Sequence, residues 1–170
     1  VSRDWSSDVC SSDLFVIDGT ATFDFSSDWL PDAYRHKPAL LHIGTLVTVI
    51  EPGASVLYEW AMRVAEFAPI VFDPNIRPAV IPDRNTYRQH VEKWIGISSV
   101  VKLSEDDLNW LYPNQDQIAL AKDWIAAGVT LVVITHGADG LTGITAEGVV
   151  KTASVKVEVI DTIEIGRAHV

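Results

Sequence analysis

Short runs of consecutive apolar residues alternate along the chain with segments in which apolar residues recur every three or four positions. Continuous apolar runs are typical of strands buried in a parallel sheet, whereas the longer period is typical of helices with one buried face. The runs predict strands at residues 15–17, 39–44, 69–72, 98–103 and 130–134. The periodic segments predict helices at residues 51–67, 83–95, 104–112 and 117–127. This alternation predicts an α/β fold: a parallel sheet with helices on both faces.

Two of the predicted helices begin with capping signals. Asp83 is a favourable N-cap, because its carboxylate can accept hydrogen bonds from free backbone N–H groups. Ser104 can cap the next helix, and Asp107 lies three positions later, where a capping box usually has Glu or Gln. The helix after Asp83 is expected to bury Tyr87, Val91 and Trp94.

The pattern changes after residue 140 to shorter strands, predicted at residues 141–145, 149–152 and 155–160. Glu147-Gly148 supplies a turn between the first two of them, which predicts a β-hairpin. No low-complexity segment interrupts this order. The chain is long enough for one domain core, or for a large piece of a bigger one.

Polar residues suited to binding lie at or just past the ends of four of the predicted strands. They are Gly44-Thr45, Asp73 to Arg77, Lys102 to Glu105 and Thr135 to Gly140. The carboxyl ends of parallel strands meet at one edge of a sheet, and ligands bind at that edge in open α/β folds. Polar turns without a function would fall as readily at the opposite edge, so this distribution favours a binding site.

The segment Val71-Phe72-Asp73-Pro74-Asn75-Ile76-Arg77-Pro78 brings a carboxylate, an amide and a guanidinium into one turn. Pro74 removes a backbone donor and ends the strand. The turn is either a polar turn with one surface salt bridge or a corner that faces a ligand. Its place among the other loops favours the second interpretation. We expect Asp73 to cap the turn as a structural residue, with Asn75 and Arg77 facing the ligand.

The segment Thr135 to Gly140 has two glycines beside a short loop. Glycine lets backbone N–H groups approach a phosphate or a flat base, and Thr135 adds a hydroxyl. A glycine-rich turn without a ligand is the alternative. We expect His136 to be a neutral loop residue, because no second histidine lies at metal-ligand spacing. His42 lies inside an apolar run and is expected to be a hydrogen-bonded core residue.

The two ends of the chain are interpreted as foreign sequence. GAG-ATC-GGA-AGA-GCA-CAC-GTC encodes residues 164–170, and the reverse complement of this string encodes residues 8–14. Ser6-Ser7-Asp8 also repeats Ser11-Ser12-Asp13. We therefore predict that residues 1–14 and 164–170 are translated sequencing adapter, and that the native part of the chain spans residues 15–163.

Composition narrows the classes of function. The whole chain has a net charge of −10, and the two ends hold two of its 13 basic and four of its 23 acidic residues, which leaves −8. An acidic chain without a basic run is a poor candidate for binding nucleic acid or an anionic membrane. The only cysteine, Cys10, lies in the predicted adapter, so the native part offers no disulfide or thiolate site. These features, with no leader or membrane-length apolar stretch, lead us to expect a cytoplasmic protein.

Four motifs resemble the ribokinase/PfkB family of carbohydrate kinases, in the family's order and spacing. They are Asp73-Pro74-Asn75-Ile76-Arg77-Pro78, Val101-Lys102-Leu103-Ser104-Glu105, Val133-Ile134-Thr135-His136-Gly137-Ala138-Asp139-Gly140 and Val159-Ile160-Asp161-Thr162. Asp18-Gly19-Thr20-Ala21, and Gly44-Thr45-Leu46 with the helix from Glu51-Pro52, resemble the fructokinase-like members.

The resemblance implies a ribokinase-like three-layer α/β/α fold with a mostly parallel central sheet and a small β lid. The lid and the C-terminal part would be missing from this chain. The implied reaction moves the γ-phosphoryl group of ATP, bound with Mg²⁺, to a sugar hydroxyl. The resemblance also implies a homodimer formed through the lid of the full-length protein.

The resemblance assigns roles to individual residues. Asn75 and Arg77 match residues near the sugar and the transferred phosphate. Glu105 matches a glutamate that helps to place magnesium indirectly, and Lys102 stands where many members have asparagine. The implied nucleotide-binding residues are Lys102, Glu105, Thr135, Gly137 and Gly140.

The chain departs from the family after Asp161-Thr162. The family continues there into a G-A-G-D turn, which forms an anion hole and supplies the aspartate that activates the sugar hydroxyl, whereas this chain continues with Ile163. We therefore expect a fructokinase-like kinase as the parent protein and no turnover from the chain itself. Two alternatives stay open: a non-catalytic nucleotide- or sugar-sensing module, and a kinase for a nucleoside or a sugar acid.

Overall fold

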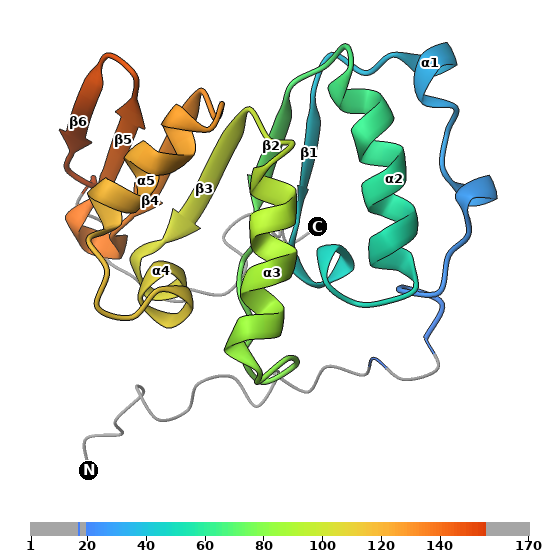
Figure 1. Cartoon of the computed structure of the whole chain (residues 1–170), viewed down its shortest axis with the longest axis horizontal. Coiled ribbons are helices and arrows are strands. Elements are labelled where there is room, and N and C mark those ends of the chain that lie inside the picture. The colour runs from blue at the N-terminus through green and yellow to red at the C-terminus, as the bar shows by residue number, and fades with distance from the viewer. Residues whose placement is uncertain (1–16, 18–19, 156–170) are drawn as a thin grey trace.

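The computed structural model describes residue 17 and residues 20–155 and contains a six-stranded sheet whose strands lie in the order of the chain (Figure 1). The strands are β1 (Leu41–Gly44), β2 (Ile70–Asp73), β3 (Val100–Ser104), β4 (Leu131–Thr135), β5 (Leu141–Thr145) and β6 (Gly148–Thr152). Strands β1 to β4 are parallel to one another, and β5 and β6 extend the sheet as antiparallel neighbours. The predicted mostly parallel sheet and the hairpin at Glu147-Gly148 are thus confirmed.

Helices connect the parallel strands at nearly the predicted positions. The α-helices are α1 (Ala33–His36), α2 (Gly53–Ala65), α3 (Arg84–Ile95), α4 (Glu105–Leu111) and α5 (Gln117–Ala126). Three short 3-10 helices are η1 (Ser27–Trp29), η2 (Thr45–Thr48) and η3 (Gly137–Asp139). Among these described helices, none has the length and apolar character needed to cross a membrane.

Some predictions fall on residues outside the described part of the chain. They are the strand at 15–17 except for its last residue, the turn at Asp18-Gly19, the strand at 155–160 except for its first residue, the motif Val159–Thr162 and the two predicted adapter ends. These predictions therefore stay predictions.

The predicted caps start their helices. The Asp83 carboxylate accepts a hydrogen bond from the Thr86 N–H at 2.7 Å at the start of α3. Ser104 and Asp107 form a reciprocal capping box at the start of α4. Asp116, which the sequence pattern did not single out, caps α5 in the same way. Each cap satisfies N–H groups that the helix cannot pair internally, so the strand-to-helix turns are well defined.

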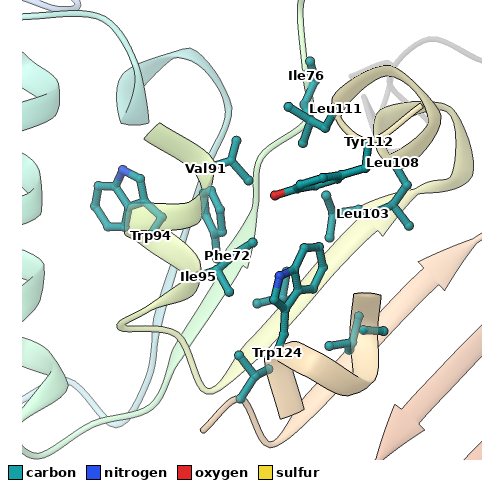
Figure 2. Close-up of a cluster of buried hydrophobic side chains, with 14 of the residues drawn as sticks. Phe72, Ile76, Val91, Trp94, Ile95, Leu103, Leu108, Leu111, Tyr112 and Trp124 are labelled. Atoms are coloured by element: carbon teal, nitrogen blue, oxygen red, sulfur yellow. The ribbon is translucent and has the colours of Figure 1, made fainter. Parts of the chain in front are cut away.

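The core lies between the sheet and the helices. Side chains that point to the helical face are buried, and those that point to the other face are only partly buried. The first group is Ile70, Phe72, Val101, Leu103, Val132 and Ile134, and the second is Val71, Val100, Lys102, Leu131, Val133 and Thr135. Figure 2 shows Phe72 near Trp94 of α3, and Leu103 and Tyr112 near Trp124 of α5. The predicted buried face of α3, with Tyr87, Val91 and Trp94, is confirmed.

The described helices that connect the parallel strands lie on one face of the sheet. Each strand from β1 to β4 is added on the same side of the previous one, and right-handed crossovers then place α2, α3, α4 and α5 on the same face (Figure 1). The alternating burial in β2, β3 and β4 agrees with this arrangement. The expected helices of the second face are therefore not among the described elements.

The prediction for His42 is wrong. Its side chain is exposed rather than buried in the core. β1 is an edge strand of the described sheet, and the register pairs His42 with Val71, which points away from the helical face. The continuous apolar run around His42 did not reveal this, because a run without alternation gives no information about which face a residue takes.

Gly44 allows the ends of β1 and β2 to approach closely. A Cβ atom at this position would overlap the carbonyl oxygen of Asp73. We predict that Gly44→Ala lowers the free energy of unfolding by about 1–3 kcal/mol, as over-packing does elsewhere. Thermal and urea unfolding of both proteins would measure the change.

Gly96→Ala is the matched control, because its Cβ atom would have its nearest neighbour at 3.4 Å. Both substitutions restrict the unfolded chain equally, so the difference between them isolates the contact at Asp73. Equal stability of the two variants would contradict the prediction.

Candidate functional site

The loop after β2 is held in place by two long-range hydrogen bonds. Ile76 N–H donates to Asp107 Oδ1 at 3.1 Å, and Arg77 N–H donates to the hydroxyl of Tyr87 at 3.2 Å. Tyr87 is fully buried, and Asn75 has a positive φ of 43°. Side chains of α3 and α4 therefore fix the backbone of a loop that has no regular secondary structure.

Asn75 and Arg77 lie together, as the sequence predicts. Arg77 Nη1 donates to Asn75 Oδ1 at 2.8 Å and to the carbonyl oxygen of Ile76 at 3.0 Å. No carboxylate of the described residues forms an ion pair with Arg77. The guanidinium is thus ordered by its own loop and keeps positive charge and N–H donors for an anionic ligand.

Asp107 connects two of the predicted site loops. One carboxylate oxygen accepts the Ile76 N–H, and the other accepts the Ser104 N–H at 3.3 Å. The sequence pattern gave Asp107 only a capping role, so its contact with the loop after β2 was missed. The available signal was a capping-box carboxylate directly after a strand that ends at the candidate edge of the sheet.

Asp73 and Lys102 form a cross-strand ion pair on the face opposite the helices. Lys102 Nζ donates to Asp73 Oδ2 at 2.8 Å, and the two side chains are 39% and 23% exposed. Asp73 does not cap its turn, so that prediction is wrong, and Asp107 accepts the turn N–H instead. Within the described part of the chain, Asp73 Oδ1 has no hydrogen-bond partner.

Glu105 lies at the first position of α4 and contacts the glycine-rich loop. Its Oε2 atom is 3.0 Å from His136 Nδ1, and His136 Nε2 is 2.9 Å from the hydroxyl of Thr142. His136 therefore lies in the loop, as expected, and it also bridges Glu105 and Thr142, which the sequence did not predict.

The loop from Thr135 to Gly140 forms a compact turn. His136 N–H donates to the carbonyl oxygen of Gly140 at 2.8 Å, and Gly137 and Gly140 have φ angles of 57° and 99°. A Cβ atom at Gly140 would overlap the carbonyl oxygen of Thr152 in β6. Thr135 Oγ1 is 3.5 Å from the carbonyl oxygen of Leu103, a weak contact. Gly137 has open space where a side chain would be, so its backbone can be approached closely.

An open pocket of about 440 Å³ adjoins this loop. It is lined by Glu105, His136, Asp139, Leu141, Thr142, Lys151, Thr152 and Ala153. Its two carboxylates and its lysine suit a polar ligand rather than an apolar one.

The residues present fit a nucleotide with magnesium. Within residues 20–155 no group of three or more His, Cys, Asp or Glu side chains could hold a metal alone. Mg²⁺ usually keeps several of its waters and binds to substrate phosphates, so the half-exposed carboxylate of Glu105 fits an indirect contact through such a water. The open backbone at Gly137 and the cationic Arg77 supply partners for phosphate oxygens.

The structure brings the predicted residues to one edge of the sheet but not into one contact network. Asn75 binds Arg77, and Glu105 binds the glycine-rich loop. Lys102 points to the opposite face and is neutralised by Asp73. Asp107 links the first two groups through backbone N–H groups alone.

Residues 11–163 match the sequence model of the family described as pfkB family carbohydrate kinase. The chain belongs to the pfkB family of carbohydrate kinases. A fructokinase from Rhizobium leguminosarum bv. trifolii is 35% identical over 152 residues, which are 89% of this chain and 46% of that protein. A fructokinase from Vibrio alginolyticus is 32% identical over 103 residues, which are 59% of this chain and 33% of that protein. The chain thus spans about half the length, or less, of the curated pfkB relatives that it matches.

Solved structures support the ribokinase-like α/β fold. Fructokinase from Vibrio cholerae O395, with fructose, ADP and calcium bound, has a TM-score of 0.75 and 25% identity over 88% of this chain and 48% of its own. Aminoimidazole riboside kinase from Salmonella enterica has a TM-score of 0.72 and 22% identity over 87% of this chain and 50% of its own. The predicted pfkB family and the predicted ribokinase-like α/β fold are both confirmed.

Tyr87 is the anchor of the Arg77 loop. Burial raises the pKa of Tyr87, and the N–H donated by Arg77 lowers it by a smaller amount. We predict that Tyr87→Phe lowers the free energy of unfolding by about 1–3 kcal/mol, because it leaves a partly buried N–H without an acceptor. Chemical denaturation would measure this loss.

Tyr58→Phe is the matched control, since the Tyr58 hydroxyl lies 3.4 Å from the carbonyl oxygen of Lys93 and is a weaker donor contact. Amide exchange at Arg77 should also become faster in Tyr87→Phe alone. Unchanged exchange there would show that the hydroxyl does not hold the loop.

Proposed function

We propose that the parent protein is a fructokinase-like carbohydrate kinase that transfers the γ-phosphoryl group of ATP to a sugar hydroxyl. The observation that carries the proposal is the placement of the Arg77 loop, the start of α4 and the glycine-rich loop at the carboxyl edge of β2, β3 and β4. This is the edge where open α/β sheets bind ligands. Membership of the pfkB family and the fructokinase relatives support the reaction class.

The proposed roles follow from what each side chain can do. Arg77 would face the transferred phosphate, because its guanidinium has no carboxylate partner among the described residues, and Asn75 would orient Arg77 and face the sugar. Glu105 would contact magnesium indirectly. Thr135, Gly137 and Gly140 would border the nucleotide. Mg²⁺, when bound with ATP, supplies charge neutralisation at the phosphates, where positioning and electrostatics provide most of the catalysis.

Lys102 differs from the other proposed nucleotide-binding residues because its charge is already neutralised. Its ammonium group is paired with Asp73 at 2.8 Å on the face opposite the helices. A nucleotide phosphate would have to compete with that carboxylate. We therefore propose that Lys102 acts on the nucleotide site indirectly. Its ion pair with Asp73 keeps the end of β3 beside the end of β2.

Fructose is the acceptor we favour, because the curated relatives named above are fructokinases. A nucleoside acceptor is the second candidate, since the Salmonella enterica neighbour was solved with aminoimidazole riboside and an ATP analogue. The other hypotheses are a kinase whose acceptor is a sugar acid and a non-catalytic module that senses a nucleotide or a sugar. We expect action in the cytoplasm and, in the full-length protein, a homodimer through the lid.

The 170-residue chain is expected to bind MgATP without phosphorylating a sugar. The resemblance implies that the aspartate of a G-A-G-D turn activates the hydroxyl, and residues 163–170 of this chain do not contain that turn. An ADP-release assay with fructose, ribose, gluconate and a nucleoside should show no rate above background, whereas calorimetry should detect MgATP. ATP-dependent turnover by the chain would refute the expected inactivity, and no binding would contradict the nucleotide site.

Arg77→Gln is expected to weaken MgATP binding roughly 10-fold, which is about 1.4 kcal/mol, because a charge-assisted contact to phosphate is lost. The unfolding free energy should change little, since among the described residues the Arg77 side chain bonds only to its own loop. Arg35→Gln, on the exposed end of α1, is the control and should bind like the wild type. Equal affinities of all three proteins would remove Arg77 from the site.

A further inference from the structure

The side chains of Glu105, His136 and Thr142 form a continuous hydrogen-bonded chain. A carboxylate can only accept, so His136 Nδ1 must carry the proton that it donates to Glu105 at 3.0 Å. In the neutral ring Nε2 is then an acceptor, and the Thr142 hydroxyl donates to it at 2.9 Å. All three polar groups are satisfied by one tautomer of the histidine, which fixes the ring orientation.

This order of carboxylate, imidazole and hydroxyl also occurs in sites where the hydroxyl is a nucleophile. Thr142 cannot act in that way here, because it is 1% exposed and points into the buried face of β5. The buried hydroxyl is instead a fixed anchor. The imidazole is 23% exposed and the Glu105 side chain is 50% exposed. The buried Thr142 therefore holds the half-buried ring, and the ring holds the exposed carboxylate at the pocket.

We propose that His136 is a positioning residue that holds the Glu105 carboxylate in the orientation needed for magnesium-dependent nucleotide binding; the proposal rests on the proposed function. A glutamate at the start of a helix has three side-chain torsions, and one hydrogen bond from an anchored ring removes most of that freedom. Groups that orient the residues around a metal in this way commonly change metal affinity 10- to 100-fold when they are removed.

His136 also fixes the loop that borders the same pocket. Its backbone N–H donates to the carbonyl oxygen of Gly140 at 2.8 Å, while its ring holds Glu105. Glu105 and His136 line the pocket of about 440 Å³. A single residue therefore sets the spacing between the magnesium-facing carboxylate and the glycine-rich loop.

The test compares the affinity of the 170-residue chain for ATP with Mg²⁺ and for ATP with excess EDTA, by calorimetry. The ratio of the two affinities is the magnesium-dependent gain. The variants are His136→Ala, Glu105→Gln, the double variant, and His136→Asn, whose amide nitrogen can replace the Nδ1 donor. His36→Ala, on the exposed end of α1, controls for the loss of an imidazole.

We expect His136→Ala to lower the magnesium-dependent gain roughly 10-fold and to leave the affinity for ATP without magnesium within about 2-fold. Glu105→Gln should have a similar effect, and the double variant should lose no more than Glu105→Gln alone, because both changes remove one coupled unit. His136→Asn should recover part of the gain, and His36→Ala should match the wild type.

The ring itself provides a readout that does not depend on nucleotide. In ¹⁵N spectra of the imidazole, Thr142→Val should move the Nε2 resonance, and Glu105→Gln should move the Nδ1 resonance. A wild-type gain that survives His136→Ala would overturn the positioning role while leaving the nucleotide site intact. Equal losses with and without magnesium would overturn it as well, since they indicate a purely structural residue. A wild-type chain that binds neither form of ATP would overturn the proposed nucleotide site and this proposal together.

Discussion

The carboxylate of Asp107 holds together the loop after β2 and the end of β3, and the candidate site depends on this link. One oxygen accepts the Ile76 N–H from the loop after β2, and the other accepts the Ser104 N–H at the end of β3. Parallel strands bring their ends to one edge, but they do not set the positions of the irregular segments that follow. Because one carboxylate accepts hydrogen bonds from both backbones, the two segments have fixed positions relative to each other. Arg77 and Glu105 each directly follow a residue whose N–H is bonded in this way.

Charge is distributed on this edge according to which face of the sheet each residue occupies. Asp73 and Lys102 neutralise one another away from the helices, whereas Glu105 accepts a hydrogen bond from His136 beside the glycine-rich loop. Within residues 20–155, the guanidinium of Arg77 has hydrogen-bond partners only in its own loop. An acidic chain can therefore present one local cation to an anionic ligand without a broad basic surface, which agrees with the absence of a basic run in the sequence.

The sequence predicted those features that local patterns encode. Capping residues such as Asp83 and Ser104, and the hairpin turn at Glu147-Gly148, depend on neighbours within a few positions, and their predictions are confirmed. The pfkB motifs identified the family for the same reason, because each motif is short and the motifs follow one another in the family's order and spacing. What failed depends on the face of the sheet or on a distant partner: His42 is exposed, and Asp73 pairs with Lys102. The contact of His136 with Thr142 across the β4–β5 connection was not predicted for the same reason. Periodicity cannot reveal such pairs.

The strictly sequential order of the six strands has a consequence for how the chain folds. Each strand from β2 onward pairs with the strand immediately before it in the chain, so no described strand has to wait for a distant segment before it can join the sheet. Loop-closure entropy is then lost one connection at a time, with long helical connections between the parallel strands and short turns before β5 and β6. During synthesis, which proceeds from the N-terminus, every newly emerged strand finds its edge already formed. Assembly along this part of the sheet can therefore follow translation.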